Sequence, residues 1–157
     1  MISAQQNDCG IDSCLTLSDL LSTLKQRYTS GLIGYGNNDT MINLIKHEPV
    51  PNVPGVITIC GSYGVNQLEL VTVISSGPTS MHQSGIRSKL TRKSKNNPHD
   101  NFLKEQIKTN EYKGLLIWWY ATMQDGHNDL PSYVSNLILN TYFQEAGKLP
   151  PGYAERS

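Results

Sequence analysis

An uninterrupted apolar run in the C-terminal third of the chain constrains the fold most. It is GLLIWWYA, from Gly114 to Ala121. The run is short and rich in branched and aromatic residues, which is typical of a β-strand. Because the apolar character is continuous, both faces of this strand should be buried. The run therefore predicts the central strand of a sheet.

Two further β-rich segments lie upstream and read as a hairpin. Val56–Cys60 and Leu68–Ser75 are predicted strands, and Ser62–Gln67 is the turn between them. Gly31–Asp39 is glycine-rich and is interpreted as a turn. It lacks the GxxxxGK[ST] spacing, which argues against a phosphate-cradling loop.

Helical patterns surround these strands. Thr16–Tyr28 carries one apolar stripe, and Thr16 with Asp19 has the spacing of a capping box. A short helix should follow a cap at Asp39 or Thr40. Three more helices are predicted at 86–93, 96–112 and 130–146. Three prolines make 47–55 an extended linker, and 149–157 is interpreted as an extended tail.

The element order predicts the fold class. From residue 53 it reads strand, strand, helix, helix, strand, helix. This order predicts an α/β protein whose small three-stranded, mostly antiparallel sheet is flanked by helices. Residues 1–52 form an N-terminal arm and helical extension, and 53–157 form the α/β core. At 157 residues the whole chain should be one compact domain.

Positive charge is concentrated in one stretch of the chain. Arg87 to Lys113 carries eight basic and three acidic residues, so +8 − 3 = +5, while the formal net charge of the chain is zero. Such an asymmetry favours a polyanionic partner, and nucleic acid is the usual one. The predicted nucleic-acid-binding residues are Lys89, Arg92, Lys93, Lys95, His99 and Lys104. The alternative is a solvated surface. Trp118, Trp119 and Tyr120 are candidates for base stacking, with core packing as the other interpretation.

Several classes of protein are disfavoured. No apolar run approaches the roughly 18 residues of a membrane helix, and the N-terminus does not resemble a secretory signal. We therefore expect a cytoplasmic protein with no membrane partner. The three cysteines, Cys9, Cys14 and Cys60, form no CxxC pair, which favours reduced thiols over a zinc site. Cys9 in NDCG superficially resembles a cysteine-peptidase nucleophile, but no histidine stands in a matching context.

The order of motifs resembles the GIY-YIG endonuclease superfamily over roughly two-thirds of the chain. Gly55-Val56-Ile57 stands at the first signature and Val73-Ile74-Ser75 near the second. SGIRSKLTRK is similar to the helix that carries the family arginine, which matches Arg87. LILNTYFQEAGKLPPGY is similar to the last helix and its proline-rich exit.

The resemblance implies metal-dependent phosphodiester hydrolysis, with Mg²⁺ or Mn²⁺ as cofactor. In the family a tyrosine assists the nucleophile, the arginine holds the phosphate and a glutamate binds the metal. Here Ile57 occupies the first tyrosine position, no tyrosine stands at the second signature, and 132–136 contains no acid. The candidate catalytic residues are Arg87, His82 as a general base and Tyr63 as a spatial substitute. Asp129 is a candidate metal ligand or, alternatively, a helix cap.

Two functional hypotheses follow. The first is a nucleic-acid-binding protein, with DNA favoured, that is either a diverged endonuclease or a catalytically inactive relative. A homodimer would suit an enzyme that acts on two strands. The second is a non-enzymatic protein-interaction or scaffold subunit, for instance of a phage or mobile-element system.

Overall fold

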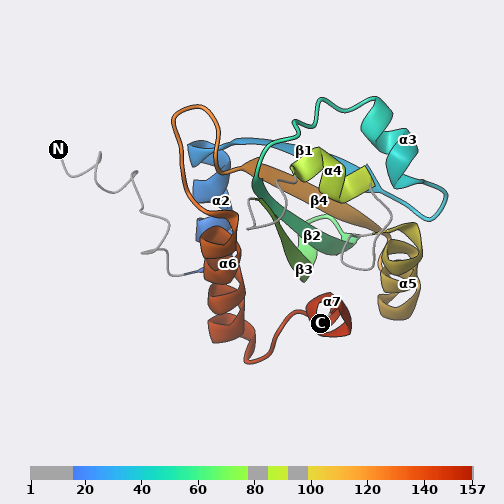
Figure 1. Ribbon diagram of the computed structural model, residues 1–157. Helices are drawn as coiled ribbons and strands as arrows, with labels where there is room; N and C mark the ends of the chain where they lie inside the picture. The colour runs from blue at the N-terminus through green and yellow to red at the C-terminus, as the bar shows by residue number, and fades with distance from the viewer. Residues whose placement is uncertain (1–15, 78–84, 92–98, 157) are drawn as a thin grey trace.

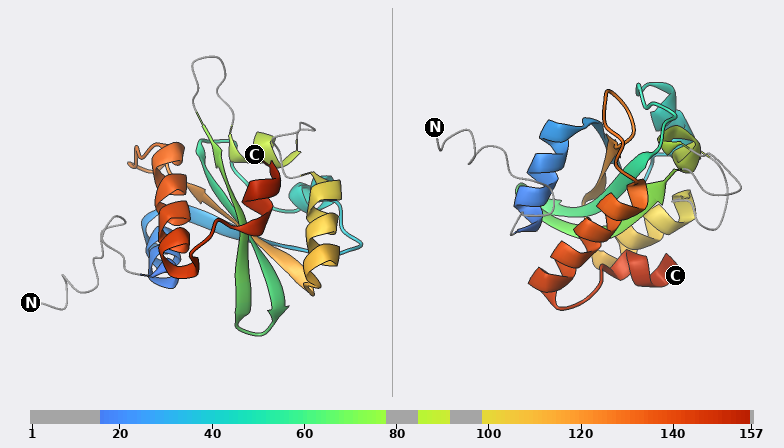
Figure 2. Two further views of the ribbon diagram at one scale, coloured as in Figure 1. Left: turned by 90° about the horizontal axis from the view of Figure 1, so that it is seen from below. Right: turned by 60° about the vertical axis from the view of Figure 1, so that its left-hand side comes forward.

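The computed structural model describes residues 16–77, 85–91 and 99–156. One four-stranded sheet lies between two groups of helices (Figures 1 and 2). Its strands are β1 (Thr29–Tyr35), β2 (Gly55–Gly64), β3 (Gln67–Ser76) and β4 (Gly114–Ala121). The order across the sheet is β1-β4-β2-β3, and each neighbouring pair is antiparallel. The α/β class with an antiparallel sheet flanked by helices is therefore confirmed.

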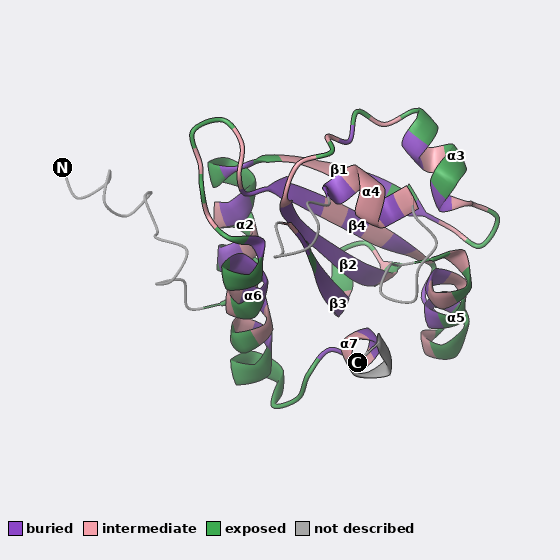
Figure 3. Cartoon of the chain, in the orientation of Figure 1, coloured by how far each residue is buried: buried purple, intermediate pink, exposed green. Residues whose placement is uncertain are grey.

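Helices cover both faces of the sheet. One face packs against α3 (Met41–Lys46), α4 (Ile86–Thr91) and α5 (Asp100–Asn110). The other packs against α2 (Leu17–Arg27) and α6 (Pro131–Ala146). Buried residues lie along the inner sides of these helices and along the strands (Figure 3). In the described part of the chain, no helix is long and apolar enough to cross a membrane.

The strand β4 confirms the prediction made from the apolar run. It pairs with both β1 and β2, so it is an inner strand of the sheet. Leu115, Ile117 and Trp119 belong to the core under α3, α4 and α5. Trp118 and Tyr120 pack on the opposite face, in the core under α2 and α6. This alternation explains why the apolar run has no polar interruption.

The sheet has four strands where three were predicted. The interpretation of Gly31–Asp39 as a turn is wrong, because this segment begins inside β1. Ile33 and Tyr35 are buried in the core, as alternate residues of a half-buried strand should be. Gly31 is a packing residue: a Cβ there would lie 2.5 Å from Cζ2 of Trp119. Glycine in this strand makes room for the indole ring rather than for a turn.

The N-terminal extension is part of the same structure as the predicted core. The helix α2 begins as predicted, with the Thr16 hydroxyl accepting a hydrogen bond from the backbone N–H of Asp19 at 3.0 Å. Leu20 and Leu24 of α2 lie in the core shared with α6. Residues 16–52 thus contribute a strand and two helices to the sheet and its two cores.

The C-terminal segment differs from the prediction. The expected extended tail contains the helix α7 (Pro151–Arg156). Gly152 lies so close to β3 that a Cβ there would be 2.5 Å from Cγ1 of Val71 and 3.2 Å from Cζ of Phe102. Tertiary contact with β3 and α5 therefore forms this helix, and its proline at the first position is compatible with a helix N-terminus.

Candidate nucleic-acid interface

The helix α4 is anchored at its N-terminus by the proline-rich linker. The first backbone N–H groups of a helix lack intrahelical partners and are natural sites for a phosphate. Here three of them donate to the linker: Ile86 to the Val53 carbonyl at 2.8 Å, Arg87 to the Pro51 carbonyl at 3.2 Å and Ser88 to Oδ1 of Asn52 at 2.9 Å. These donors are already engaged, so the N-terminus of α4 does not offer them to an anion.

The Arg87 side chain also points into the protein's own backbone. Its guanidinium donates to the carbonyls of Ile45 at 3.2 Å, Glu48 at 3.3 Å and Val50 at 3.3 Å. Carbonyls at the end of a helix need such partners, and the planar guanidinium fork can reach several at once. Arg87 therefore ties α4 to the end of α3 and to the linker. Its contact with a phosphate stays a prediction, and a phosphate would compete with these carbonyls.

Tyr63 and Arg87 lie near opposite ends of β2. Ile86, next to Arg87, packs at the start of the strand, where a Cβ on Gly55 would be 2.6 Å from its Cδ1. Tyr63 lies eight residues further along the same strand. At about 3.3 Å per residue, that separation is about 26 Å. The structure does not bring these two candidate catalytic residues together.

Tyr63 belongs instead to an aromatic–carboxylate group that sequence reasoning missed. Its hydroxyl lies 3.4 Å from Oε2 of Glu69, and Tyr112 donates to Oε1 of the same carboxylate at 3.0 Å. The two rings are 4.9 Å apart between centroids. Burial, and then the nearby Glu69 charge, raise the pKa of Tyr112. The group joins β2, β3 and Tyr112, which lies two residues before β4, and its only sequence signal was the polar Glu69 within an apolar strand.

His99 and Lys104, two predicted nucleic-acid contacts, make local contacts at α5. His99 is the N-cap, and its Nδ1 accepts from the backbone N–H of Phe102 at 3.4 Å. Lys104 donates to the Asp39 carbonyl at 2.9 Å and lies 5.9 Å from the Tyr35 ring centroid. His99 remains exposed to solvent, whereas Lys104 is half-buried. Of the two, His99 is the more accessible to a ligand.

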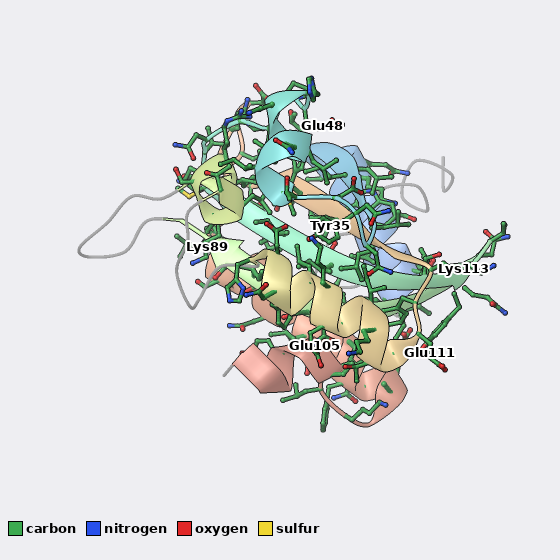
Figure 4. The ribbon with its side chains drawn as sticks, turned by 90° about the vertical axis from the view of Figure 1, so that its right-hand side faces the viewer. Tyr35, Glu48, Lys89, Glu105, Glu111 and Lys113 are labelled. Atoms are coloured by element: carbon green, nitrogen blue, oxygen red, sulfur yellow. The ribbon has the colours of Figure 1, made fainter. Side chains whose placement is uncertain are left out.

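The exposed side of α5 carries both signs of charge. Glu105 and Lys108 are exposed on the helix. Glu111 and Lys113 follow it, and Figure 4 labels them together with Glu105. The positive excess of the basic stretch therefore lies before α5, where residues 87–95 contain five basic residues and no acid. Among these, Lys89 is half-buried at the end of α4. The candidates His82, Arg92, Lys93 and Lys95 lie outside the described residues.

Asp129 is held by neighbours rather than presented to solvent as a metal ligand. It accepts a short hydrogen bond from the Tyr28 hydroxyl, and Arg27 approaches it at 3.1 Å. Partial burial acts to raise the pKa of Asp129, but the hydrogen bonds from Tyr28 and Arg27 outweigh it and lower the pKa. Across residues 16–77, 85–91 and 99–156, no three His, Cys, Asp or Glu side chains gather where they would hold a metal ion. Through its contact with Arg27, Asp129 connects the loop before α6 to α2.

The position that the resemblance assigns to the first family tyrosine is apolar and buried, whereas Ser75 of the second signature is exposed. Ile57, at the place of the first family tyrosine, is fully buried in the core under α3, α4 and α5. Trp119 and Tyr120 are also buried, which supports core packing for them rather than base stacking. Trp118 is partly exposed, and Nζ of Lys25 lies 4.2 Å from its ring centroid.

Comparisons of this chain with protein-family profiles, with curated proteins and with solved structures found no match.

Proposed function

We propose that this chain is a nucleic-acid-binding protein with a GIY-YIG-like core, and that it does not hydrolyse phosphodiesters by the chemistry of that family. The order β2, β3, α4, α5, β4, α6 supports the relationship, since it repeats the hairpin, arginine helix, third strand and last helix of the resemblance. The arrangement of β2 between β3 and β4 makes one antiparallel unit of these segments.

The observation that carries the binding proposal is the basic segment 87–95. It begins on α4, and the described chain resumes at α5, the next helix on the same face of the sheet. Apart from Arg87, this segment carries Lys89, Arg92, Lys93 and Lys95 and no acid, which favours contacts with a phosphate backbone. Phosphate contacts of this kind are independent of sequence, so we expect binding of DNA with little base preference.

The proposal that the protein does not hydrolyse phosphodiesters is supported by the side chains that the family chemistry would need. Arg87 is engaged by three carbonyls, and Asp129 by Tyr28 and Arg27. Ile57 offers no hydroxyl to assist a nucleophile. Phosphoryl transfer requires charge neutralisation and an activated water, and these residues supply neither in the arrangement described.

Binding is tested by fluorescence anisotropy with labelled duplex DNA at several salt concentrations. We expect the double variant Arg92→Gln, Lys93→Gln to lose affinity by roughly ten- to a hundredfold near 0.1 M salt and to flatten the salt slope by about 1 per lost contact. The matched control is Lys46→Gln, Lys148→Gln, which removes the same charge from exposed sites elsewhere. Equal losses in both variants would point to a net-charge effect and contradict the assignment.

Hydrolysis is tested separately with supercoiled plasmid and either Mg²⁺ or Mn²⁺. We expect no nicking above that of the buffer. Cleavage that disappears in Arg87→Ala, in protein that stays folded, would identify an active nuclease and refute this part of the proposal.

A second candidate function is protein interaction through the β2–β3 hairpin. Its end projects beyond the helices (Figure 2). It exposes Tyr63 by 41%, Val65 by 89% and Leu68 by 48%, which is unusual for three neighbouring apolar residues. This function would be favoured over the first by two results together. The protein would not bind DNA at low salt, and a protein partner that binds the wild type would no longer bind Val65→Asp.

A further inference from the structure

The outer edge of β1 is not paired with any described strand. β1 pairs with β4 on one side and ends the sheet on the other. Alternate residues of an edge strand direct their backbone N–H and C=O groups away from the sheet. The strand is accessible, since Thr29, Leu32 and Gly34 are exposed and a Cβ on Gly34 would meet nothing within 4 Å. At the other edge of the sheet, β3 has α7 packed against it.

β1 lacks the features that usually keep an edge strand from pairing. Monomeric proteins place lysine, proline or a bulge on such edges. The sequence TSGLIGY contains no charged residue and no proline, and its register with β4 runs without interruption from Thr29 to Tyr35. Its middle residue, Leu32, is 44% exposed.

We propose that two copies of this chain pair through β1, antiparallel, about a two-fold axis at Leu32. The pairing would place Leu32 beside Leu32 of the second copy and Ile33 beside the Gly31 position. Leu32 is already in register with Trp118 of β4, so the dimer completes a row Trp118–Leu32–Leu32–Trp118 across one eight-stranded sheet. A two-fold interface must be complementary to itself, and this row meets that condition because it reads the same from either copy.

Symmetry and charge favour a second copy over an unrelated extended peptide. The exposed leucine stands at the centre of the seven-residue strand, so one register aligns the strand over its full length. The formal net charge of zero removes long-range repulsion between copies. The seven residues of β1 are fewer than the roughly 20–30 residues that each side contributes to a standard interface. We therefore expect a weak dimer, with a dissociation constant on the order of 10 µM.

The assembly is tested by sedimentation velocity without nucleic acid, from about 1 to 200 µM, a range that brackets the expected constant. The wild-type sedimentation coefficient should rise with concentration. Leu32→Lys should stay monomeric, because a central lysine would be stacked against its own copy. Leu149→Lys is the control: it places the same charge on a leucine that is 46% exposed, outside both β1 and the β2–β3 hairpin, and should dimerise like wild type.

Hydrogen exchange keeps the proposal testable if a variant misfolds. In wild-type protein, the amides of residues 29–35 should exchange more slowly at about 200 µM than at about 1 µM, while those of the β2–β3 hairpin should not change. A wild-type chain that is monomeric throughout overturns the proposal. The proposal is also overturned if folded Leu32→Lys associates as strongly as the wild type, or if association leaves the hydrogen exchange of β1 unaltered. Either result would place the contact on another surface.

Discussion

The guanidinium of Arg87 joins segments that are far apart in the sequence. Its three acceptors lie at the end of α3 and in the linker that follows. The linker in turn accepts backbone hydrogen bonds from the start of α4. The carbonyls of Ile45 and Glu48 also accept backbone N–H groups, so Arg87 adds a charged donor to carbonyls that the chain has already brought together.

Replacing Arg87 should therefore reduce stability, whatever its role toward nucleic acid. We expect Arg87→Ala to lower the free energy of unfolding by about 2 kcal/mol, the scale of lost hydrogen bonds to a charged donor. Arg87→Lys should recover only a small part of this, since an ammonium group cannot reproduce the planar fork. Urea denaturation measures both. If the urea midpoint of Arg87→Ala equalled that of the wild type, the three contacts would be dispensable for stability.

At the scale of elements, β1 shows how glycine can mislead sequence interpretation. Three glycines within residues 31–36 suggested a turn. In the structure Gly31 admits the Trp119 ring, whereas Gly34 faces open space. The same residue type therefore has two different reasons to be present in one strand.

This difference predicts opposite responses to the same substitution. Gly31→Ala should destabilise the protein by about 1–3 kcal/mol, because the new methyl group overlaps a buried indole that has little room to move. Gly34→Ala should be neutral or stabilising by up to about 1 kcal/mol, since it only restricts the unfolded chain. Thermal or urea unfolding distinguishes them, and a change in tryptophan fluorescence should accompany Gly31→Ala alone. Equal effects of the two substitutions would contradict the packing argument.

The whole molecule buries many groups that ionise at alkaline pH. Burial raises the pKa of the Cys60 thiol from 9.0 to about 12, against an opposing influence of Lys25. Burial is also the largest cause of the raised pKa of Tyr28, Tyr35, Tyr112 and Tyr120. These groups hold their protons more tightly in the folded than in the unfolded state.

Stability should consequently fall at high pH. Below the ordinary thiol pKa of 9.0 the contribution of Cys60 is complete, and it is lost as the pH rises from there through about 12. The tyrosines add to the loss above their ordinary pKa of 10.0. Urea midpoints at pH 7.5, 9 and 10.5 should decrease, and the decrease between pH 9 and pH 10.5 should be smaller in Cys60→Ala. A urea midpoint that rises with pH over this range would contradict the expected loss of stability.

Local elements with strong, short-range signals could be predicted from the amino-acid sequence. The apolar run Gly114–Ala121 predicted an inner strand, and Thr16 with Asp19 predicted the start of α2. The hairpin of β2 and β3 followed from β-rich runs on either side of a turn. These predictions succeeded because periodicity and capping depend on residues that are neighbours in the chain.

The fourth strand, the helix α7 and the partners of the polar candidates depend on contacts between distant segments. β1 forms because β4 offers an edge and Trp119 fits over Gly31, and α7 forms against Val71 and Phe102. Arg87 and Asp129 looked like groups for a phosphate or a metal, yet their acceptors and donors come from residues about 40 and 100 positions away. Contacts between distant segments leave no periodic trace in the sequence, so their energies become visible only once the sheet has brought the segments together.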